Sequence, residues 1–110
     1  MHNLFSYGTL RDEDVQRAVF GRTVATTSDA MVGHRMVTVT ITDPKAIAIS
    51  GRSDHRIVEP TGHDDDQVEG AVLSISEDEL RRADAYEDAA YKRVSVRLRS
   101  GADAWVYVRA

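Results

Sequence analysis

The sequence contains no cysteine, and this absence excludes several kinds of chemistry at once. Without a thiol the chain has no disulfide, no thiolate zinc site, no iron–sulfur cluster and no cysteine nucleophile. Long apolar runs are also lacking, since none approaches the roughly 20 residues that a membrane-spanning helix requires. Proline occurs only twice, and no segment is repeated or of low complexity. We therefore expect no membrane association and no thiol chemistry.

An excess of positive charge is lacking as well. The chain has 14 basic and 18 acidic residues, a net charge of −4 and a pI near 5.5. This balance argues against a general nucleic-acid binder. A length of 110 residues is typical of one compact domain, which we place over residues 1–110. The first residues include no basic region and no small-residue cleavage site, so a cytoplasmic protein is expected.

Apolar residues mostly alternate with polar ones, which is typical of half-buried strands. Two helices are also predicted, one from Asp12 to Phe20 that ends at Gly21, and one from Ser76 to about Tyr86 or Glu87. The pattern indicates an α+β fold whose mixed or antiparallel sheet curls into a small barrel flanked by two or more short helices. Strands are predicted over residues 4–7, 36–41, 46–49, 56–58, 68–75, 91–99 and 104–108, with a turn at Asp43–Pro44.

The helix that begins at Ser76 places an acidic residue on its apolar face. Ser76 and Glu79 form a capping box, in which each side chain accepts a hydrogen bond from the other residue's backbone N–H. Leu80, Ala83 and Glu87 share one face because they are spaced i, i+3 and i+7. A desolvated Glu87 would have a raised pKa and could transfer a proton near neutral pH. The alternative is a helix that ends at Tyr86 and leaves Glu87 in a solvated last turn.

Two further segments could contribute binding groups. The segment Ser6 to Leu10 is a strand entering a tight turn, where Gly8 and successive backbone N–H groups could hold an anion such as a carboxylate. Tyr91 and Arg93 project from one side of a later strand and could contact a substrate or orient Glu87. Alternatively, Arg93 belongs to a solvent-facing stripe with Arg97 and Arg99.

The remaining polar groups have simpler interpretations. The carboxylates of Asp84 and Asp88 are interpreted as a solvated helix face that pairs locally with Arg81 and Arg82. The acidic run after His63 lacks the alternating ligand spacing of calcium loops, so no metal site is predicted. Phosphate loops, dinucleotide fingerprints and the nucleophile-elbow sequence are absent from the sequence. No cofactor is therefore expected.

Two segments together resemble the hallmarks of the gamma-glutamylcyclotransferase-like family, which includes the plant avirulence-induced-gene type and short bacterial proteins. The first is Tyr7-Gly8-Thr9-Leu10, which is similar to the family's Y-G-[ST]-L turn. The second is the segment at residues 84–93, which is similar to D-x-Y-E-x-x-x-Y-x-R. The strand at residues 68–72 also resembles the family's V-x-G-x-V strand. Both hallmarks stand in the family's order and separation, whereas residues 31–66 contribute little to the resemblance.

The resemblance implies a small barrel in which the turn and Glu87 line one cavity. By the family's pattern, Tyr7, Gly8, Thr9 and Leu10 bind the substrate, largely through backbone groups, and Glu87 is the acid/base. Tyr91 matches a tyrosine at the cavity. One departure is Asp88, where many members have glycine; a second carboxylate there could change which substrates enter.

The implied reaction is cyclisation of a small-molecule gamma-glutamyl amine or amide to 5-oxoproline with release of the amine. The substrate supplies the nucleophile, so one carboxylate suffices and neither a thiol nor a cofactor is needed. Two alternatives remain from the sequence. One is a non-catalytic domain of the same fold that binds a small carboxylate metabolite. The other is an enzyme that removes a gamma-glutamyl group during biosynthesis. The sequence leaves the leaving group and the oligomeric state open.

Overall fold

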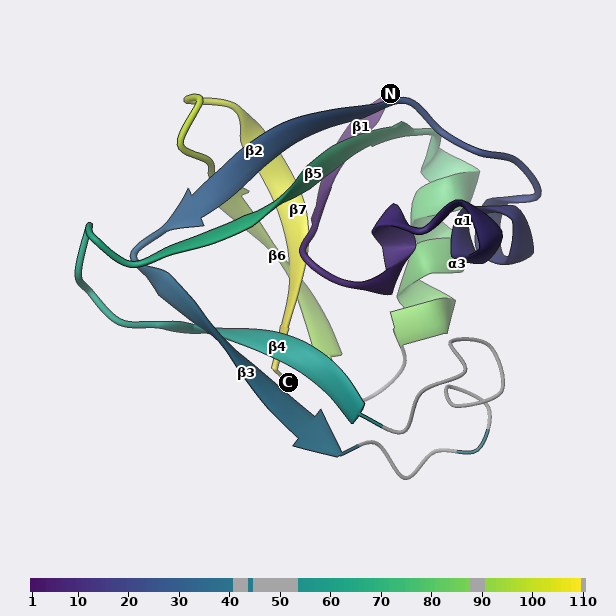
Figure 1. Cartoon of the computed structure of the whole chain (residues 1–110). Helices are drawn as coiled ribbons and strands as arrows, with labels where there is room; N and C mark the ends of the chain where they lie inside the picture. Colours follow the sequence, from purple (N-terminus) through teal and green to yellow (C-terminus); the bar gives the residue numbers. More distant parts are fainter. Residues whose placement is uncertain (41–43, 45–53, 88–90, 110) are drawn as a thin grey trace.

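The computed structural model describes residues 1–40, 44, 54–87 and 91–109. Seven strands, two α-helices and one short 3-10 helix are assigned within these ranges (Figure 1). Their order along the chain is β1 (His2–Ser6), η1 (Thr9–Arg11), α1 (Glu13–Phe20), β2 (Thr26–Val32), β3 (His34–Thr40), β4 (Asp54–Pro60), β5 (Gln67–Ile75), α3 (Glu77–Glu87), β6 (Tyr91–Arg97) and β7 (Asp103–Arg109).

Five strands form one mixed sheet in the order β2-β5-β1-β7-β6, and β3 pairs with β4 in a separate two-stranded ribbon. The β1–β7 pair is parallel, whereas the β1–β5, β2–β5 and β6–β7 pairs are antiparallel. The large sheet curls strongly, as Figure 1 shows. The predicted α+β fold with a curled mixed sheet is confirmed.

The two edges of the curled sheet meet at one end of the molecule. There the backbone N–H of Arg99, just after β6, donates to the carbonyl of Ala30 in β2 at 2.9 Å. Beside this bond, the buried carboxylate of Asp29 accepts hydrogen bonds from the backbone N–H and the hydroxyl of Ser100. An edge strand otherwise presents unpaired backbone groups, so these contacts close the sheet where β2 and β6 would be open.

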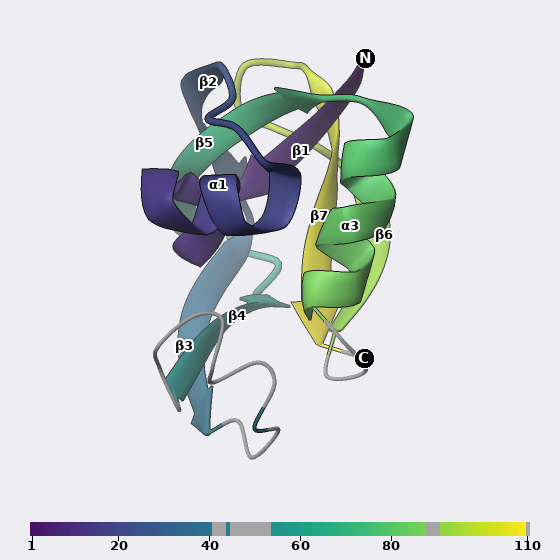
Figure 2. The ribbon, with the colours of Figure 1, turned by 90° about the vertical axis from the view of Figure 1, so that its right-hand side faces the viewer.

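Helices α1 and α3 pack together on one side of the sheet (Figure 2). Each has a recognisable local signal: α1 ends at Gly21, whose φ of 76° suits a glycine, and α3 begins with the predicted capping box. In that box the Ser76 N–H donates to the Glu79 carboxylate at 2.9 Å, and the Glu79 N–H donates to the Ser76 hydroxyl at 3.2 Å. The predicted helices are therefore confirmed.

The central strand β1 is buried on both of its faces. Leu4 packs in a core beneath the helices with Leu73 and Leu80, whereas Phe5 packs in a second core with Met31. Both Leu4 and Phe5 are almost fully buried. A short strand with two buried faces has a continuous apolar sequence, which is why residues 4–7 lack polar alternation.

One strand was missed by the sequence prediction. Strand β2 (Thr26–Val32) begins with three exposed polar residues and buries Asp29, so it shows neither an apolar run nor alternation. Its place is fixed by antiparallel pairing with β5 over the whole strand. The strand predicted at 46–49 and the turn at Asp43–Pro44 involve residues outside the described part of the chain. Among the described residues, no helix is long and apolar enough to cross a membrane.

Candidate active site

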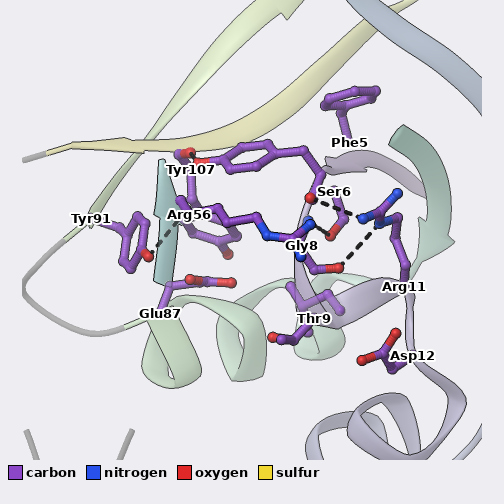
Figure 3. A pocket seen from close by; sticks show the side chains of 12 residues that line it. Phe5, Ser6, Gly8, Thr9, Arg11, Asp12, Arg56, Glu87, Tyr91 and Tyr107 are labelled. Atoms are coloured by element: carbon purple, nitrogen blue, oxygen red, sulfur yellow. Dashed lines mark hydrogen bonds between the residues drawn. The ribbon is translucent and has the colours of Figure 1, made fainter. Parts of the chain in front are cut away.

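A cavity of about 250 Å³ opens where β1 ends, beside the C-terminal end of α3 (Figure 3). The chain segment after β1 forms one wall. Side chains from β4, from the end of α3 and from the last two strands form the others. The lining consists of residues 5–12 together with Arg56, Glu87, Tyr91 and Tyr107. The two sequence segments singled out at the ends of the chain therefore meet at one cavity.

The turn after β1 is held by its own polar groups. The Gly8 N–H donates to the Ser6 hydroxyl at 3.3 Å, and the Arg11 guanidinium donates to the carbonyls of Tyr7 and Gly8 at 3.1 and 3.2 Å. The backbone N–H groups of Thr9 and Leu10 have no acceptor in the described part of the chain. They are thus available to an anion or an oxyanion in the cavity.

A glycine in β5 sets the position of this turn. A Cβ atom at Gly70 would lie against the Ser6 carbonyl oxygen and 2.6 Å from Cζ of Phe5. The end of β1 can approach β5 this closely only because residue 70 has no side chain. The glycine of the V-x-G-x-V strand therefore has a packing reason, namely room for the turn that lines the cavity. At Gly8, in contrast, an added Cβ would meet no atom within 4 Å.

Glu87 ends helix α3 and lies at the cavity wall. Leu80 and Ala83, which share its helical face, are buried in the core as the spacing predicted. The alternative in which the helix ends at Tyr86 is wrong, since α3 includes Glu87. Burial of the carboxyl group raises its pKa to about 8. No hydrogen-bond donor in the described part of the chain contacts this carboxyl group, so no bond to a protein group offsets the cost of desolvating its charge.

Three tyrosine side chains surround the same space, and all remain protonated. Burial is the main cause that raises the pKa values of Tyr7, Tyr91 and Tyr107, and the nearby Glu87 charge raises each further. The Tyr7 hydroxyl donates to the Tyr107 carbonyl at 2.6 Å, and the Tyr91 hydroxyl donates to the Arg56 carbonyl at 3.4 Å. Their bulk and neutral hydroxyls keep the surroundings of Glu87 poorly solvated.

The structure separates Arg93 from the other candidate residues. Its guanidinium donates to both oxygens of Asp84 at 2.8 and 3.2 Å and lies 4.4 Å from the ring centre of Trp105. Arg93 borders a shallow depression beside Trp105 and is absent from the lining of the main cavity. The prediction that Asp84 pairs locally on a solvated face is wrong, because Asp84 binds Arg93 of β6 and accepts from the Tyr107 hydroxyl at 2.8 Å.

Several contributors to the site were given no role by the sequence analysis. Arg56 and Tyr107 line the cavity, and the hydroxyl of Tyr86, a residue of the second hallmark, hydrogen-bonds that of Thr9 at 2.6 Å, joining α3 to the turn. Tyr107 alternates with the aliphatic residues of the last strand, as Trp105 does, so the pattern placed it on the opposite face from Val106. No such pattern placed Arg56, since its place depends on how the β3–β4 ribbon folds back. Asp88 lies outside the described residues.

No cluster of metal ligands emerges from the described residues. Within those ranges, no three histidine, aspartate or glutamate side chains come together as metal ligands would. The cavity instead offers the carboxyl group of Glu87 with its raised pKa, the guanidinium of Arg56, which has no hydrogen-bond acceptor within the described ranges, and backbone N–H donors. This set suits a small organic molecule that carries its own carboxylate and amine.

The chain is similar to known proteins over nearly its whole length. A family model described as gamma-glutamyl cyclotransferase, AIG2-like, matches residues 4–110. AIG2-like protein D of Arabidopsis thaliana is 33% identical over 99 residues, which cover 89% of this chain and 57% of that protein. This chain thus spans little more than half the length of that relative.

Three solved structures share the fold. Two solution structures of A. thaliana proteins match with TM-scores of 0.74 and 0.71 at 24% and 23% identity, covering 98% of this chain and 68% and 61% of theirs. A crystal structure of an uncharacterized Pyrococcus horikoshii protein matches with a TM-score of 0.64 at 14% identity, covering 99% of this chain and 78% of that one. At these identities the likeness concerns the fold alone.

Proposed function

Because this chain belongs to the gamma-glutamyl cyclotransferase, AIG2-like family, we propose that it cyclises the gamma-glutamyl group of a small-molecule substrate to 5-oxoproline. The observation that carries the proposal is the position of Glu87. It is a carboxyl group with a pKa raised to about 8, in the same cavity as the open N–H groups of Thr9 and Leu10. An acid/base and an oxyanion site are the two groups that this reaction needs.

The reaction requires one proton acceptor that later becomes a donor. Glu87 as carboxylate takes a proton from the substrate's α-ammonium group, and the freed amine attacks the γ-carbonyl carbon. A carbon–nitrogen bond forms and closes the five-membered ring. The bond from the same carbon to the leaving nitrogen then breaks as Glu87 returns the proton to that nitrogen. The ring nitrogen, which still carries two hydrogens after the attack, gives its second proton through Glu87 to the released amine, which departs as an ammonium ion. Positioned proton transfer of this kind contributes roughly 10² to 10⁴ in rate.

The raised pKa of Glu87 suits both steps. A carboxyl group with a pKa of about 8 exists in both forms near neutral pH, so it can accept a proton and also return it. An ordinary carboxylate, with a pKa near 4.3, would be a poor base for an α-ammonium group. Because the substrate supplies the nucleophile, the proposal requires no cofactor.

The turn after β1 would hold the glutamyl group. Its open N–H groups at Thr9 and Leu10 can bind the α-carboxylate or the oxygen that becomes negative as the amine attacks. Gly8 leaves open space at the cavity wall, so the backbone can come close to the substrate. Tyr91 lines the same space, whereas Arg93 would act from outside it by holding Asp84 against Tyr107.

The test is incubation with a panel of gamma-glutamyl amines, gamma-glutamyl dipeptides and glutathione, scoring the release of 5-oxoproline. We expect release from at least one compound and a loss of about 10² to 10⁴ in kcat for Glu87→Gln, with the circular dichroism of the folded protein retained. Full activity of Glu87→Gln would remove the proposed role. Stoichiometric binding without turnover across the panel would favour the non-catalytic carboxylate-binding alternative.

A further inference from the structure

An arginine outside both sequence hallmarks reaches into the cavity. Arg56 belongs to β4 (Asp54–Pro60). The residue is exposed to solvent and also lines the cavity. Figure 3 shows its side chain extended over Glu87 toward the turn at Gly8. This guanidinium therefore lies at the mouth of the proposed active site.

The charge of Arg56 has no counterpart in the described part of the chain. Arg11, the other arginine of the cavity, donates to the carbonyls of Tyr7 and Gly8. Arg22 and Arg93 form two-pronged pairs with Glu79 and Asp84. No carboxylate or carbonyl within the described ranges accepts a hydrogen bond from the side chain of Arg56. A guanidinium is always charged and matches a carboxylate in shape, so a carboxylate in the cavity would complement it.

The depth of the groups indicates which part of the substrate faces Arg56. The open N–H groups belong to Thr9, which is half-buried, and to Leu10, which is only 2% exposed, whereas Arg56 is exposed. With its α-carboxylate on these N–H groups, the glutamyl group occupies this deeper end of the cavity. The leaving group then points toward solvent, where Arg56 is exposed.

We propose that Arg56 binds a carboxylate on the leaving group. The chain then prefers gamma-glutamyl amino acids to gamma-glutamyl amines that lack a carboxylate. This inference rests on the function proposed above and deepens it by naming the substrate class. Glu87 performs the proton transfers for either class, whereas Arg56 discriminates between them by charge.

The test uses a matched pair of substrates, gamma-glutamyl-alanine and gamma-glutamyl-alaninamide, which differ in one charge and little in size. For the wild-type protein we expect kcat/KM to be about 10- to 100-fold higher for the acid, the range of a charge-assisted hydrogen bond. In Arg56→Gln this ratio should fall to about one. Arg35→Gln is the control, because Arg35 lies on the same ribbon but pairs with Glu59 at the surface, and its ratio should match the wild type.

The possible outcomes separate this inference from the proposed function. A wild-type ratio near one, with 5-oxoproline released from both compounds, overturns the role of Arg56 and leaves the cyclisation intact. The inference is also overturned if the acid-to-amide ratio of kcat/KM in Arg56→Gln stays at the wild-type value. In that case Arg56 binds a group common to both substrates, even if both rates are reduced. If neither compound is cyclised, the proposed function fails. The affinities of the two compounds, measured by calorimetry, then test Arg56 separately, and equal affinities for the acid and the amide overturn the charge discrimination as well.

Discussion

Helix α3 has a glutamate that is shielded from solvent near each end, buried at Glu79 and half-buried at Glu87, and the two carboxyl groups have opposite hydrogen bonding. Glu79, in the first turn, receives two hydrogen bonds from the Arg22 guanidinium at 2.8 and 2.9 Å and one from the Ser76 N–H. These bonds outweigh its burial, so its pKa is lowered. Glu87, in the last turn, has no such donor in the described part of the chain, and burial alone raises its pKa to about 8.

The difference separates a structural carboxylate from a chemically available one. At Glu79 the negative charge is fully used by donors of the protein, so it fixes the start of the helix and its contact with Arg22. At Glu87 the charge is costly to form, and no group within the described ranges donates a hydrogen bond to it. A desolvated carboxylate without hydrogen-bond donors is stabilised most by a substrate that supplies a proton or a positive charge. The two glutamates thus have different roles, and the presence or absence of hydrogen-bond donors distinguishes them.

The largest expected effect on stability is the pH dependence that Glu87 imposes. Its pKa is raised in the folded protein, so between about pH 5 and 8 the folded chain holds a proton that the unfolded chain has released. Stability from this group is therefore complete below the unfolded pKa and is lost as pH rises through about 8. Because one pKa unit corresponds to about 1.4 kcal/mol and this pKa rises from about 4.3 to about 8, the free energy of unfolding of Glu87→Gln, relative to wild type, should rise by about 5 kcal/mol between pH 4 and pH 9.

Urea unfolding of both proteins across this range measures the difference, and Glu79→Gln provides the matched control on the same helix. Because the pKa of Glu79 is lowered, its stabilising contribution is present above its unfolded pKa and is lost as pH falls. Glu79→Gln should thus be less stable than wild type by a constant amount at neutral and alkaline pH, and the two profiles should converge as pH falls below the unfolded pKa of Glu79. Parallel profiles for Glu87→Gln and wild type would show that Glu87 is ionised in the folded protein like an exposed glutamate.

Local signals explain which features of the helix and sheet could be predicted. The capping box at Ser76 and the apolar spacing of Leu80 and Ala83 depend on near neighbours, so they predicted the start of α3 and the buried face that carries Glu87. Strand β2 has no such local signal, because its buried residues include Asp29 and its partner is β5. The bond between Arg99 and Ala30 that closes the sheet is likewise set by tertiary pairing alone.

The residues of the candidate site also fall into those that could be predicted from the sequence and those that depend on tertiary folding. The placement of the Tyr7–Leu10 turn and Glu87 on one cavity was expected from the family resemblance, and both line it. Glu87 was also expected from helical spacing. Arg56 joins them from a ribbon whose course no short-range pattern specifies. Arg93 was expected near Glu87 because it is close in sequence, yet its fork with Asp84 holds the guanidinium outside the main cavity.

A smaller effect is expected when the paired glutamate loses its partners. Glu79→Ala removes both the ion pair with Arg22 and the return bond to Ser76, so it should lower the free energy of unfolding at pH 7 by about 2 kcal/mol. Glu79→Gln keeps the bond to Ser76 and should cost about half as much. Thermal and urea unfolding check both values. Because Glu79 lies away from the cavity, kcat per folded molecule should stay at the wild-type value. A loss of kcat without a loss of stability would contradict a purely structural role for Glu79.

The smallest expected effect concerns the bond that holds Glu87 in place. The Tyr86 hydroxyl bonds the Thr9 hydroxyl at 2.6 Å, and this contact sets the distance between the last turn of α3 and the substrate-binding turn. Tyr86→Phe and Thr9→Val each remove it and should each lower the free energy of unfolding by about 1 kcal/mol, with a several-fold lower kcat. If the two residues act through one bond, the double variant should lose little more than either single variant. Additive losses in both stability and kcat would mean that Tyr86 and Thr9 act separately, and that Glu87 is positioned by the packing of α3 alone.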